Sequence, residues 1–376
     1  MCYDSPGVRI LIDYRPALRQ RTGVGEYVHG LAAALVLDLP PEESVTLFSS
    51  SWKDRLPTGV VPGTFQKDIR IPVRLLNFGW HRLEWPPVEW LAGPYDIVHS
   101  MHPLMIPARN AARLITIHDL YFLDRPEHTA AEIRRDYPAL AADHARRADG
   151  IIVNSDYTRR QVIDRLGVDD ERITVCTPGN PGWPRRAEPE RPGPILFVGT
   201  VEPRKNLRRL MEAYSGLLER RDDIPDLVLA GAFPAWKSGL FTGAASPGKA
   251  AERIRLTGYV TDDERQRLYR EASMLVLPSL DEGFGIPALE AMTIGVPVLA
   301  SNRGALPDVV ADAGILVDPE NVAALAAAIE RVLDGELLRR QMADDGVARA
   351  AQFTWASSAA RLHEAYRRAH LQRRSA

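Results

Sequence analysis

Two glutamates, Glu282 and Glu290, are separated by seven residues in the segment DEGFGIPALEAMTIGVPVLAS, residues 281–301. The apolar run SMLVLPS precedes them, and Pro287 suits the first turn of a helix that ends at Gly295. Main-chain N–H groups at the start of a helix bind anions, and carboxylates accept hydrogen bonds from sugar hydroxyls. The segment predicts a phosphate site with two hydroxyl acceptors, although a plain strand-to-helix turn is an equal alternative.

A second candidate site is the basic pair Arg204 and Lys205 in VGTVEPRKNL, which follows an apolar strand ending at Gly199. We expect the pair to open a helix, where two cations oppose the helix dipole. Such a conflict between local chemistry and local structure indicates a functional role. Arg and Lys together suit a diphosphate, which they would stabilise as a leaving group. The alternative is a solvated basic face.

Three further features lie in the first half of the chain. Gly23 and Gly25 in RTGVGEYVHGL match only half of a dinucleotide fingerprint, so the turn serves either substrate approach or packing. His118 ends the apolar strand TIHDL, at the edge where α/β sheets bind ligands. His99 and His102, in DIVHSMH, lie at the end of another predicted strand, and we expect them at a similar edge, lining the acceptor side.

Composition narrows the class of protein. Lys+Arg number 47 and Asp+Glu 49, a net charge of -2, which argues against a dedicated nucleic-acid binder. The two cysteines, Cys2 and Cys176, form neither a disulfide framework nor a metal pattern. No metal-binding, Walker A or GxSxG motif is present, so we expect neither a metal nor a cofactor. Without a secretory or membrane-spanning pattern, a cytoplasmic location is expected.

The elements that must position these residues are short apolar strands alternating with helical patterns. This alternation predicts doubly wound, mostly parallel α/β sheets, whose ligands bind at the carboxyl ends of the strands. A capping box, Thr261 to Glu264, opens one helix, and Asp318-Pro319 predicts the start of another at 319. The expected strands are 8–14, 44–50, 96–100, 113–119, 150–155, 172–178, 194–200, 226–232, 254–260, 273–279, 297–301 and 314–318.

A Pro- and Gly-rich stretch, GNPGWPRRAEPERPGP, interrupts the alternation and is typical of a linker. We therefore predict an amino-terminal Rossmann-like domain over 1–180, a linker over 181–193 and a second domain over 194–354. Two such domains facing each other would enclose a cleft.

Taken together, these segments resemble the retaining glycosyltransferases of family 4, which have the GT-B fold. The resemblance covers nearly the whole chain, through the early glycine turn, TIHDL, VGTVEPRKNL, LTGYV, VLPSLDEGFG and the E-x7-E pair in order. TIHDL with LDRPE, and VGTVEPRKN, are most similar to the mannosyltransferase-like branch of bacterial O-antigen and polysaccharide pathways. The family implies that a helix from about 355 to 376 returns to the amino-terminal domain.

The resemblance also implies roles for the candidate residues. Arg204 and Lys205 would bind the donor diphosphate, Glu282 would face the transferred sugar, and His118 would lie near the reaction centre. The donor-binding set that the resemblance implies is Gly23, Gly25, Gly199, Tyr259, Val260, Phe284, Gly285, Ile286 and Glu290, with Glu290 on the ribose and Tyr259-Val260 at the base.

The implied reaction moves a sugar from a nucleotide sugar to a glycan or lipid-linked acceptor, with retention and without a metal. GDP-mannose is the favoured donor, while UDP-sugars and dTDP-rhamnose stay open. The rivals are another nucleotide-sugar enzyme of this fold, such as an epimerase or a phosphorylase, and a non-catalytic two-domain sugar-binding protein.

Peripheral contact with the inner face of a membrane also stays open. Trp80, Trp85 and Trp90 with Arg82 suit an interface, but Glu84 and Glu89 weaken the basic character and Pro86-Pro87 breaks any helix. We favour a packed or acceptor-lining loop. A second basic region contains Arg134, Arg135, Arg146 and Arg147.

Overall fold

The computed structural model describes residues 7–18, 21, 23–129, 131–187, 192–232 and 249–375, so that Cys2 and part of the predicted linker lie outside the described residues. The chain forms two compact units. One contains Met1–Gly179 together with Thr354–Ala376, and the other contains Asn180–Phe353.

The first unit is built on a seven-stranded parallel sheet with the order β3-β2-β1-β4-β5-β6-β7. Its strands are β1 (Arg9–Asp13), β2 (Ser44–Ser50), β3 (Phe65–Ile69), β4 (Ile97–Ser100), β5 (Ala112–Ile117), β6 (Gly150–Val153) and β7 (Ile173–Val175). Its helices are α1 (Gly23–Leu37), α2 (Val73–Phe78), α3 (Val88–Ala92), α4 (Tyr121–Asp124), α5 (Ala131–Arg147), α6 (Asp156–Leu166) and α14 (Trp355–Ser375), with the short turns η1 (Arg15–Ala17), η2 (Gly79–Leu83), η3 (Pro126–His128) and η4 (Asp170–Arg172).

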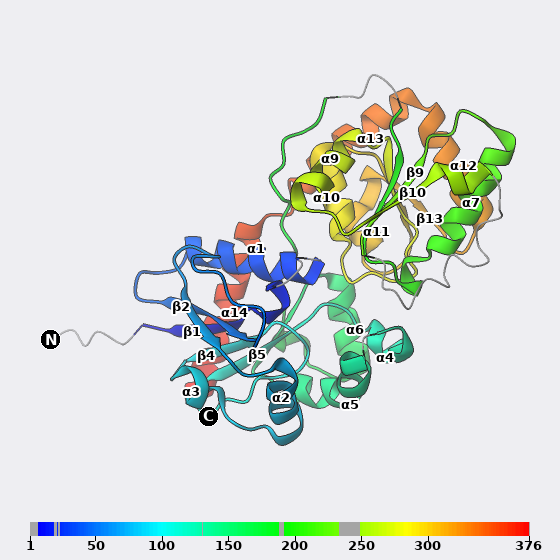
Figure 1. The fold of residues 1–376 in the computed structure, drawn as a ribbon. Helices are drawn as coiled ribbons and strands as arrows, with labels where there is room; N and C mark the ends of the chain where they lie inside the picture. Colours follow the sequence, from blue (N-terminus) through cyan, green and yellow to red (C-terminus); the bar gives the residue numbers. More distant parts are fainter. Residues whose placement is uncertain are drawn as a thin grey trace. The chain divides into compact units, whose positions relative to one another are not determined.

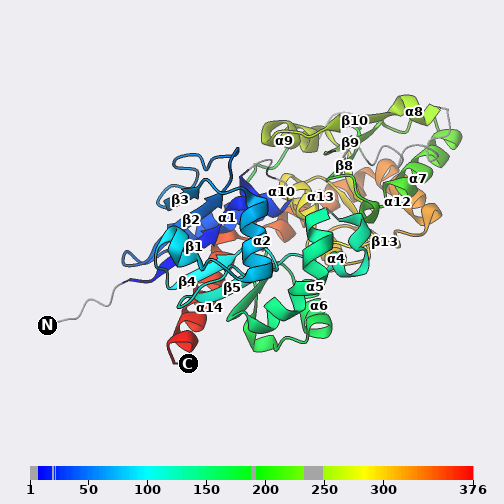
Figure 2. The same cartoon turned by 60° about the horizontal axis from the view of Figure 1, so that its bottom comes forward.

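Helices cover both faces of this sheet (Figures 1 and 2). One face packs on α1 and α14, where Leu31, Leu362 and Tyr366 join the core. Residues of α2 and α3 pack on the other face around Trp80, and α5 and α6 cover its far end. The carboxyl-terminal helix α14 thus belongs to the core of the amino-terminal unit.

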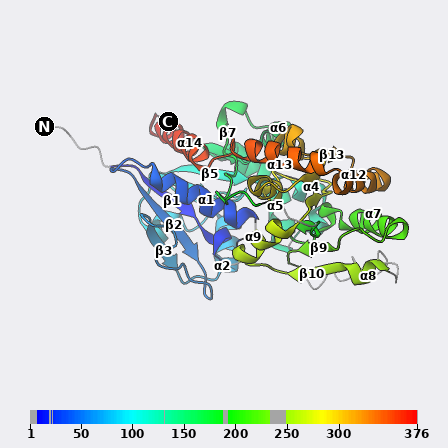
Figure 3. The same cartoon turned by 90° about the horizontal axis from the view of Figure 1, so that it is seen from above.

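The second unit has a six-stranded parallel sheet with the order β10-β9-β8-β11-β12-β13. Its strands are β8 (Ile195–Val198), β9 (Leu227–Ala230), β10 (Ile254–Gly258), β11 (Met274–Leu277), β12 (Val298–Ser301) and β13 (Ile315–Val317). Its helices are α7 (Leu207–Arg220), α8 (Lys249–Arg253), α9 (Asp262–Glu271), α10 (Ile286–Ile294), α11 (Leu306–Val310), α12 (Val322–Asp334) and α13 (Glu336–Ala350), with the turns η5 (Pro203–Lys205) and η7 (Ala311–Ala313). Within this unit α7 packs on α12 and α10 packs on α13 (Figures 1 and 3).

Local signals in the sequence match several element ends. The capping box of Thr261 and Glu264 is present at the start of α9, and Gly295 ends α10 in the left-handed conformation. The expectation for Asp318 is wrong, because Asn321 caps α12 by accepting a hydrogen bond from the Ala324 N–H. Asp318 instead accepts from the Glu320 N–H in the preceding turn. Two polar residues that both suit a cap are not distinguished by local sequence.

Strand β3 was not predicted. Its sequence, FQKDI, lacks the apolar run that marks the other strands, and it lies at the edge of its sheet, paired only with β2. An edge strand of this kind needs fewer buried side chains, so its pattern is weak.

Candidate active site

The second unit brings two loops together at the carboxyl edge of its sheet. The chain builds outward from β8 through β9 to β10, and then returns to place β11 on the other side of β8. Ligands of open α/β sheets bind where the strand order reverses in this way. The loop after β8 contains Arg204 and Lys205, and the loop after β11 contains Glu282 and Gly285.

These two loops meet through a buried ionic cluster. The Lys205 Nζ lies 2.5 Å from one carboxylate oxygen of Glu282, and Arg204 lies 3.3 Å from the other. The Ser279 hydroxyl donates to the same carboxylate over 2.7 Å. Lys205 and Glu282 are only 7% and 6% exposed. Three residues from two separate sequence motifs therefore form one cluster, and Ser279 is a further member that was not predicted.

The cluster keeps Glu282 ionised. Burial alone would raise the pKa of its carboxyl group, but Lys205 and Arg204, with the hydrogen bonds from Lys205 and Ser279, hold that pKa below the ordinary value. Arg204 is further held by Glu202 at 2.8 Å. The acids beside the basic pair explain how two cations are tolerated at this position.

The backbone of the basic pair is fixed from both sides. The Arg204 carbonyl accepts a hydrogen bond from the Leu280 N–H over 2.7 Å, which ties the two loops together. Asn206 has a left-handed conformation with φ of 56°, and its side-chain amide donates to the carbonyls of Pro278 and Pro319. Asn206 was also missed, although a left-handed position is a recognised preference of Asn.

The start of α10 presents main-chain donors to the same edge. Gly285 has φ of 103° and precedes the helix, and Pro287 occupies its first turn. In the part of the chain that the structure describes, the N–H groups of Phe284, Gly285 and Ile286 have no hydrogen-bond partner. Donors of this kind at a helix amino terminus suit a phosphate group.

The loop that contains Gly304 and Ala305, which was not predicted, contacts the Glu282 backbone. The Ala305 N–H donates to the Glu282 carbonyl over 2.9 Å. Gly304 has φ of 63°, and a Cβ atom there would come within 2.6 Å of the Glu282 nitrogen. Only glycine fits this position without moving the Glu282 backbone.

Glu290 belongs to a different network. It is 4% exposed, accepts a hydrogen bond from the Tyr269 hydroxyl at 2.9 Å, and forms an ion pair with Arg265 at 3.3 Å. Arg265 in turn lies over the ring of Trp183. The structure thus connects Glu282 to the basic pair and Glu290 to Tyr269 and Arg265.

The other residues assigned to the donor lie at neighbouring strand ends. Gly199 follows β8 with φ of 153°, and its N–H donates to the Ala230 carbonyl. Tyr259 and Val260 follow β10, and the Tyr259 side chain is 41% exposed. All three therefore lie on the carboxyl side of the sheet.

In the first unit, His118 lies beside the helix that begins with the glycine turn. Gly23 and Gly25 form the first turn of α1, and a Cβ atom on Gly25 would lie 3.1 Å from the Pro16 carbonyl oxygen. Tyr27 of the same helix packs edge-on against the His118 ring, with centroids 5.1 Å apart. His118 is half-buried, and burial lowers its pKa despite a hydrogen bond to the Met101 carbonyl.

The expectation for His99 is wrong. Its ring is fully buried between the Tyr366 hydroxyl at 2.7 Å and the Thr116 hydroxyl at 2.8 Å, so it fastens α14 to the sheet and lines no substrate edge. Burial lowers the pKa of His99 to about 3, which keeps the ring neutral.

His102 instead belongs to a cluster at the carboxyl ends of β1 and β4. Asp13 is fully buried and forms a two-pronged ion pair with Arg15, with both contacts at 2.7 Å. His102 lies 3.4 Å from the same carboxylate. Asp13 was not predicted as a site residue, although a charged residue at the end of an apolar strand is a recognisable signal.

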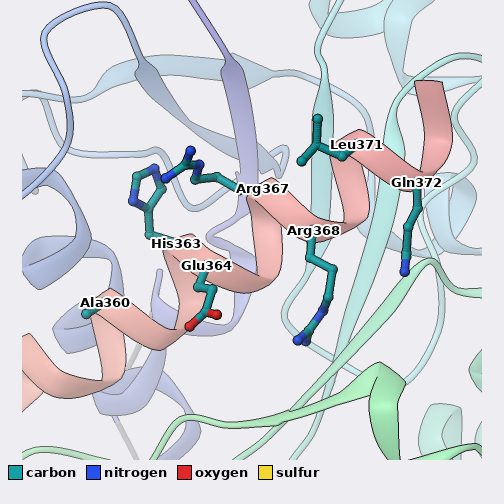
Figure 4. A pocket seen from close by; sticks show the side chains of 7 residues that line it. All are labelled: Ala360, His363, Glu364, Arg367, Arg368, Leu371 and Gln372. Atoms are coloured by element: carbon teal, nitrogen blue, oxygen red, sulfur yellow. The ribbon is translucent and has the colours of Figure 1, made fainter. Parts of the chain in front are cut away.

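Two further features of the described residues concern other kinds of site. No group of three or more His, Cys, Asp or Glu side chains in that part of the chain is arranged to hold a metal ion. A shallow pocket of about 510 Å³ lies along α14, and none of the predicted site residues lines it (Figure 4).

Comparisons with known proteins agree across both units. Residues 184–349 match the family described as glycosyl transferases group 1, and residues 21–181 match Glycosyltransferase Family 4. The O-antigen chain mannosyltransferase B of Escherichia coli is 30% identical over 96% of this chain and 100% of its own length. A D-inositol 3-phosphate glycosyltransferase of Corynebacterium glutamicum (strain R) is 28% identical over 79% of this chain and 77% of its own.

Solved structures agree on the fold. The sucrose-phosphate synthase of Thermosynechococcus elongatus superimposes with a TM-score of 0.76 and 21% identity, over 96% of this chain and 98% of that one. Together with the two parallel sheets, this likeness shows a GT-B fold.

Proposed function

This chain belongs to the group 1 and family 4 glycosyltransferases, and from that premise we propose that it transfers mannose from GDP-mannose to a hydroxyl of a glycan or lipid-linked saccharide. The reaction retains the anomeric configuration and needs no metal ion. The whole-chain likeness to an O-antigen mannosyltransferase supports the choice of mannose.

The observation that carries the proposal is the buried cluster of Arg204, Lys205 and Glu282 next to the start of α10. In the proposed complex the donor diphosphate lies between the two cations and the N–H groups that precede α10. The diphosphate competes with Glu282 for Lys205, and the released carboxylate accepts hydrogen bonds from the sugar hydroxyls.

The proposed chemistry follows from this arrangement. The bond between the sugar C1 and the diphosphate oxygen breaks, and the acceptor oxygen forms a bond to C1 on the same face of the sugar. The acceptor proton passes to the leaving diphosphate. Arg204 and Lys205 stabilise the charge that develops on this group, which is the part a metal ion plays elsewhere. Glu282 positions the sugar and is not the general base.

The remaining residues complete the proposed donor and acceptor contacts. Glu290 accepts hydrogen bonds from the ribose, and the backbone of Tyr259 and Val260 contacts the base. In the first unit we assign His118 to the reacting end of the acceptor and the glycine turn at Gly23 to substrate approach. A lipid-linked acceptor implies peripheral contact with the inner face of a membrane.

The test is a transfer assay with separate donors. The protein is incubated with GDP-mannose, UDP-glucose or dTDP-rhamnose, with EDTA, and with a bacterial lipid extract that contains polyprenyl diphosphate-linked saccharides. We expect incorporation from GDP-mannose alone, and an α-linked product by NMR. Incorporation from another donor overturns the choice of mannose, and loss of transfer in EDTA overturns metal independence.

A further inference from the structure

Exposed apolar side chains are concentrated in one short segment of the first unit. Of the fourteen large apolar residues that are exposed among the described residues, five lie within sixteen positions: Leu75, Phe78, Leu83, Trp85 and Trp90. Scattered exposure needs no explanation, but a concentration of this kind marks an interaction surface. The segment spans α2, η2 and α3.

The two tryptophans lie at the end of α14, through a chain of direct contacts. The rings of Trp85 and Trp90 pack edge to face at 6.0 Å and are 56% and 57% exposed. The Arg109 guanidinium lies over Trp90 at 4.8 Å, and Arg373 of α14 donates to the Arg109 carbonyl. Figure 1 shows α3 close to the carboxyl end of the chain. We call Trp85, Trp90, Arg109, Arg373 and Arg374 the aromatic–basic patch.

The tertiary structure gives both acids of this segment hydrogen-bond partners. Glu84 is bound through both oxygens by Arg147, and Glu89 accepts hydrogen bonds from the N–H groups of Arg109 and Asn110. Glu84 is therefore paired with a cation, whereas Glu89 is held through one oxygen by main-chain donors. Trp80 does not take part, because it is fully buried in the core.

The charged side chains of α14 are mostly positive. The helix contains five Arg and one Glu, and it ends with Arg373 and Arg374. Arg367 and Arg368 of the same helix line the shallow pocket along it (Figure 4). Tryptophans at the level of lipid headgroups, flanked by arginines, form a typical contact with an anionic bilayer.

The patch lies away from the substrate edge of its sheet. Strand β4 begins shortly after α3, and β5 begins shortly after Arg109, so these residues border the amino edge of the parallel sheet. His118 and the cluster around Asp13 lie at the carboxyl edge. A surface bound at the patch therefore leaves the substrate edge of this unit uncovered.

We propose that the aromatic–basic patch docks the protein on the surface of an anionic lipid bilayer. The tryptophans insert among the headgroups, and the arginines pair with anionic lipid. The proposal goes beyond the proposed function, and its test does not depend on catalysis. No described helix is long and apolar enough to cross a membrane, so contact by the patch is peripheral.

Co-sedimentation with sucrose-loaded vesicles tests the proposal. Vesicles of phosphatidylcholine alone are compared with vesicles containing phosphatidylglycerol, at low and high salt. We expect binding to the anionic vesicles that weakens with salt. Each arginine at the surface contributes roughly fivefold to the partition coefficient, so Arg109→Ser with Arg374→Ser should lower it roughly 25-fold.

The aromatic part is tested by Trp85→Ser with Trp90→Ser, and Trp52→Ser is the matched control, because Trp52 is 68% exposed elsewhere on the same unit. Arg208→Ser and Arg340→Ser, both exposed in the second unit, control for loss of charge. We expect the patch variants to lose vesicle binding and the controls to retain it. Circular dichroism confirms that each variant is folded.

Three results overturn the proposal: no binding to anionic vesicles at low salt, equal binding by the patch variants, or a patch that instead mediates self-association in light scattering. Sugar transfer from GDP-mannose to a water-soluble acceptor is measured in parallel. Failure of vesicle binding with intact transfer rejects the patch alone, and intact vesicle binding without transfer rejects the proposed function alone.

Discussion

At the scale of single residues, the candidate active site depends on charges that are buried and mutually compensated. Glu282 has two cationic neighbours and a hydroxyl donor; Glu282, Lys205 and Ser279 are buried, and Arg204 is partly buried. Removing one partner leaves an uncompensated buried charge, which costs far more than the loss of an exposed ion pair. Substitutions here should therefore affect stability as well as activity.

The Glu282→Gln variant should show this in its dependence on pH. The folded-state pKa of Glu282 lies below the ordinary value of 4.5, so the carboxylate contributes stability above that pH and loses it as the pH falls further. We expect the variant to be less stable by about 3–5 kcal/mol at neutral pH, with a difference that shrinks below pH 4.5. Urea unfolding at pH 7, 5 and 4 measures it. A difference that grows on acidification contradicts the assignment.

Lys205→Ala should reduce kcat/KM for the donor by about 10²–10³-fold, because it removes a charge that stabilises the leaving diphosphate. Arg208→Ala is the matched control, since its side chain is 73% exposed and pairs with Glu212 on α7. Initial rates with GDP-mannose in EDTA measure both. Full activity in the Lys205 variant would remove the basis for the diphosphate site.

The proposed contact between Glu290 and the ribose is tested by removing the ribose hydroxyls from the nucleotide. If Glu290 accepts hydrogen bonds from the ribose, wild-type protein should bind GDP more tightly than 2′,3′-dideoxy-GDP. Glu290→Gln should lose most of that preference, by roughly 1–2 kcal/mol. Calorimetric titration measures the four affinities. An unchanged preference would indicate that Glu290 acts within the protein, through contacts such as those with Tyr269 and Arg265.

At the scale of elements, two strand-to-helix loops and one supporting loop form the candidate site at the carboxyl edge of the second unit's sheet. Their shapes depend on single positions with left-handed backbone conformations, at Asn206, Gly285 and Gly304. At each of these positions the backbone lies close to another loop. The packing of the loops therefore also positions the charged side chains that they bear.

Gly304→Ala and Gly216→Ala form a matched pair of glycine substitutions. In Gly304→Ala the new methyl group meets the Glu282 backbone at 2.6 Å in a left-handed conformation, and we expect a loss of more than 1 kcal/mol. Gly216 lies inside α7 with open space around it, so its substitution should stabilise by about 0.5–1 kcal/mol. Thermal unfolding compares them. Similar shifts for both variants would contradict the close approach at Gly304.

At the scale of the whole molecule, the two units differ in which parts of the chain form their cores. The second unit is one continuous segment with a core of its own, whereas the first needs α14 from the end of the chain. Leu362 and Tyr366 of α14 are fully buried against α1 and the sheet, and Tyr366 is the partner of His99.

A fragment of residues 180–353 should therefore fold alone and still bind GDP, because it contains the basic pair, Glu282 and Glu290. A fragment of residues 1–179 should not fold cooperatively, since it lacks the helix that covers one face of its sheet. Circular dichroism melts and GDP titration test the pair, and adding a peptide of residues 354–376 should restore folding of the first fragment. Cooperative folding of 1–179 by itself would contradict this account.

Many strands, caps and turns of this protein could be predicted from its sequence, because they depend on residues that are close together in the chain. Strands buried on both faces read as continuous apolar runs, and caps and turns need particular residues, so the α/β alternation and the capping box at Thr261 could be predicted. Strand β3 could not, because an edge strand needs little apolar surface. The cap of α12 was misassigned because Asp318 and Asn321 have the same local chemistry.

The motifs and the order in which they occur follow from the sequence alone, because they depend on residue type and spacing. Tertiary packing sets which side chains meet. It joined Lys205 to Glu282 across 77 residues, gave Glu290 different partners, buried His99 under Tyr366, and placed Trp90 beside Arg109 at the end of α14. Such contacts depend on which strands are neighbours in a sheet and where α14 packs, and no local pattern contains that information.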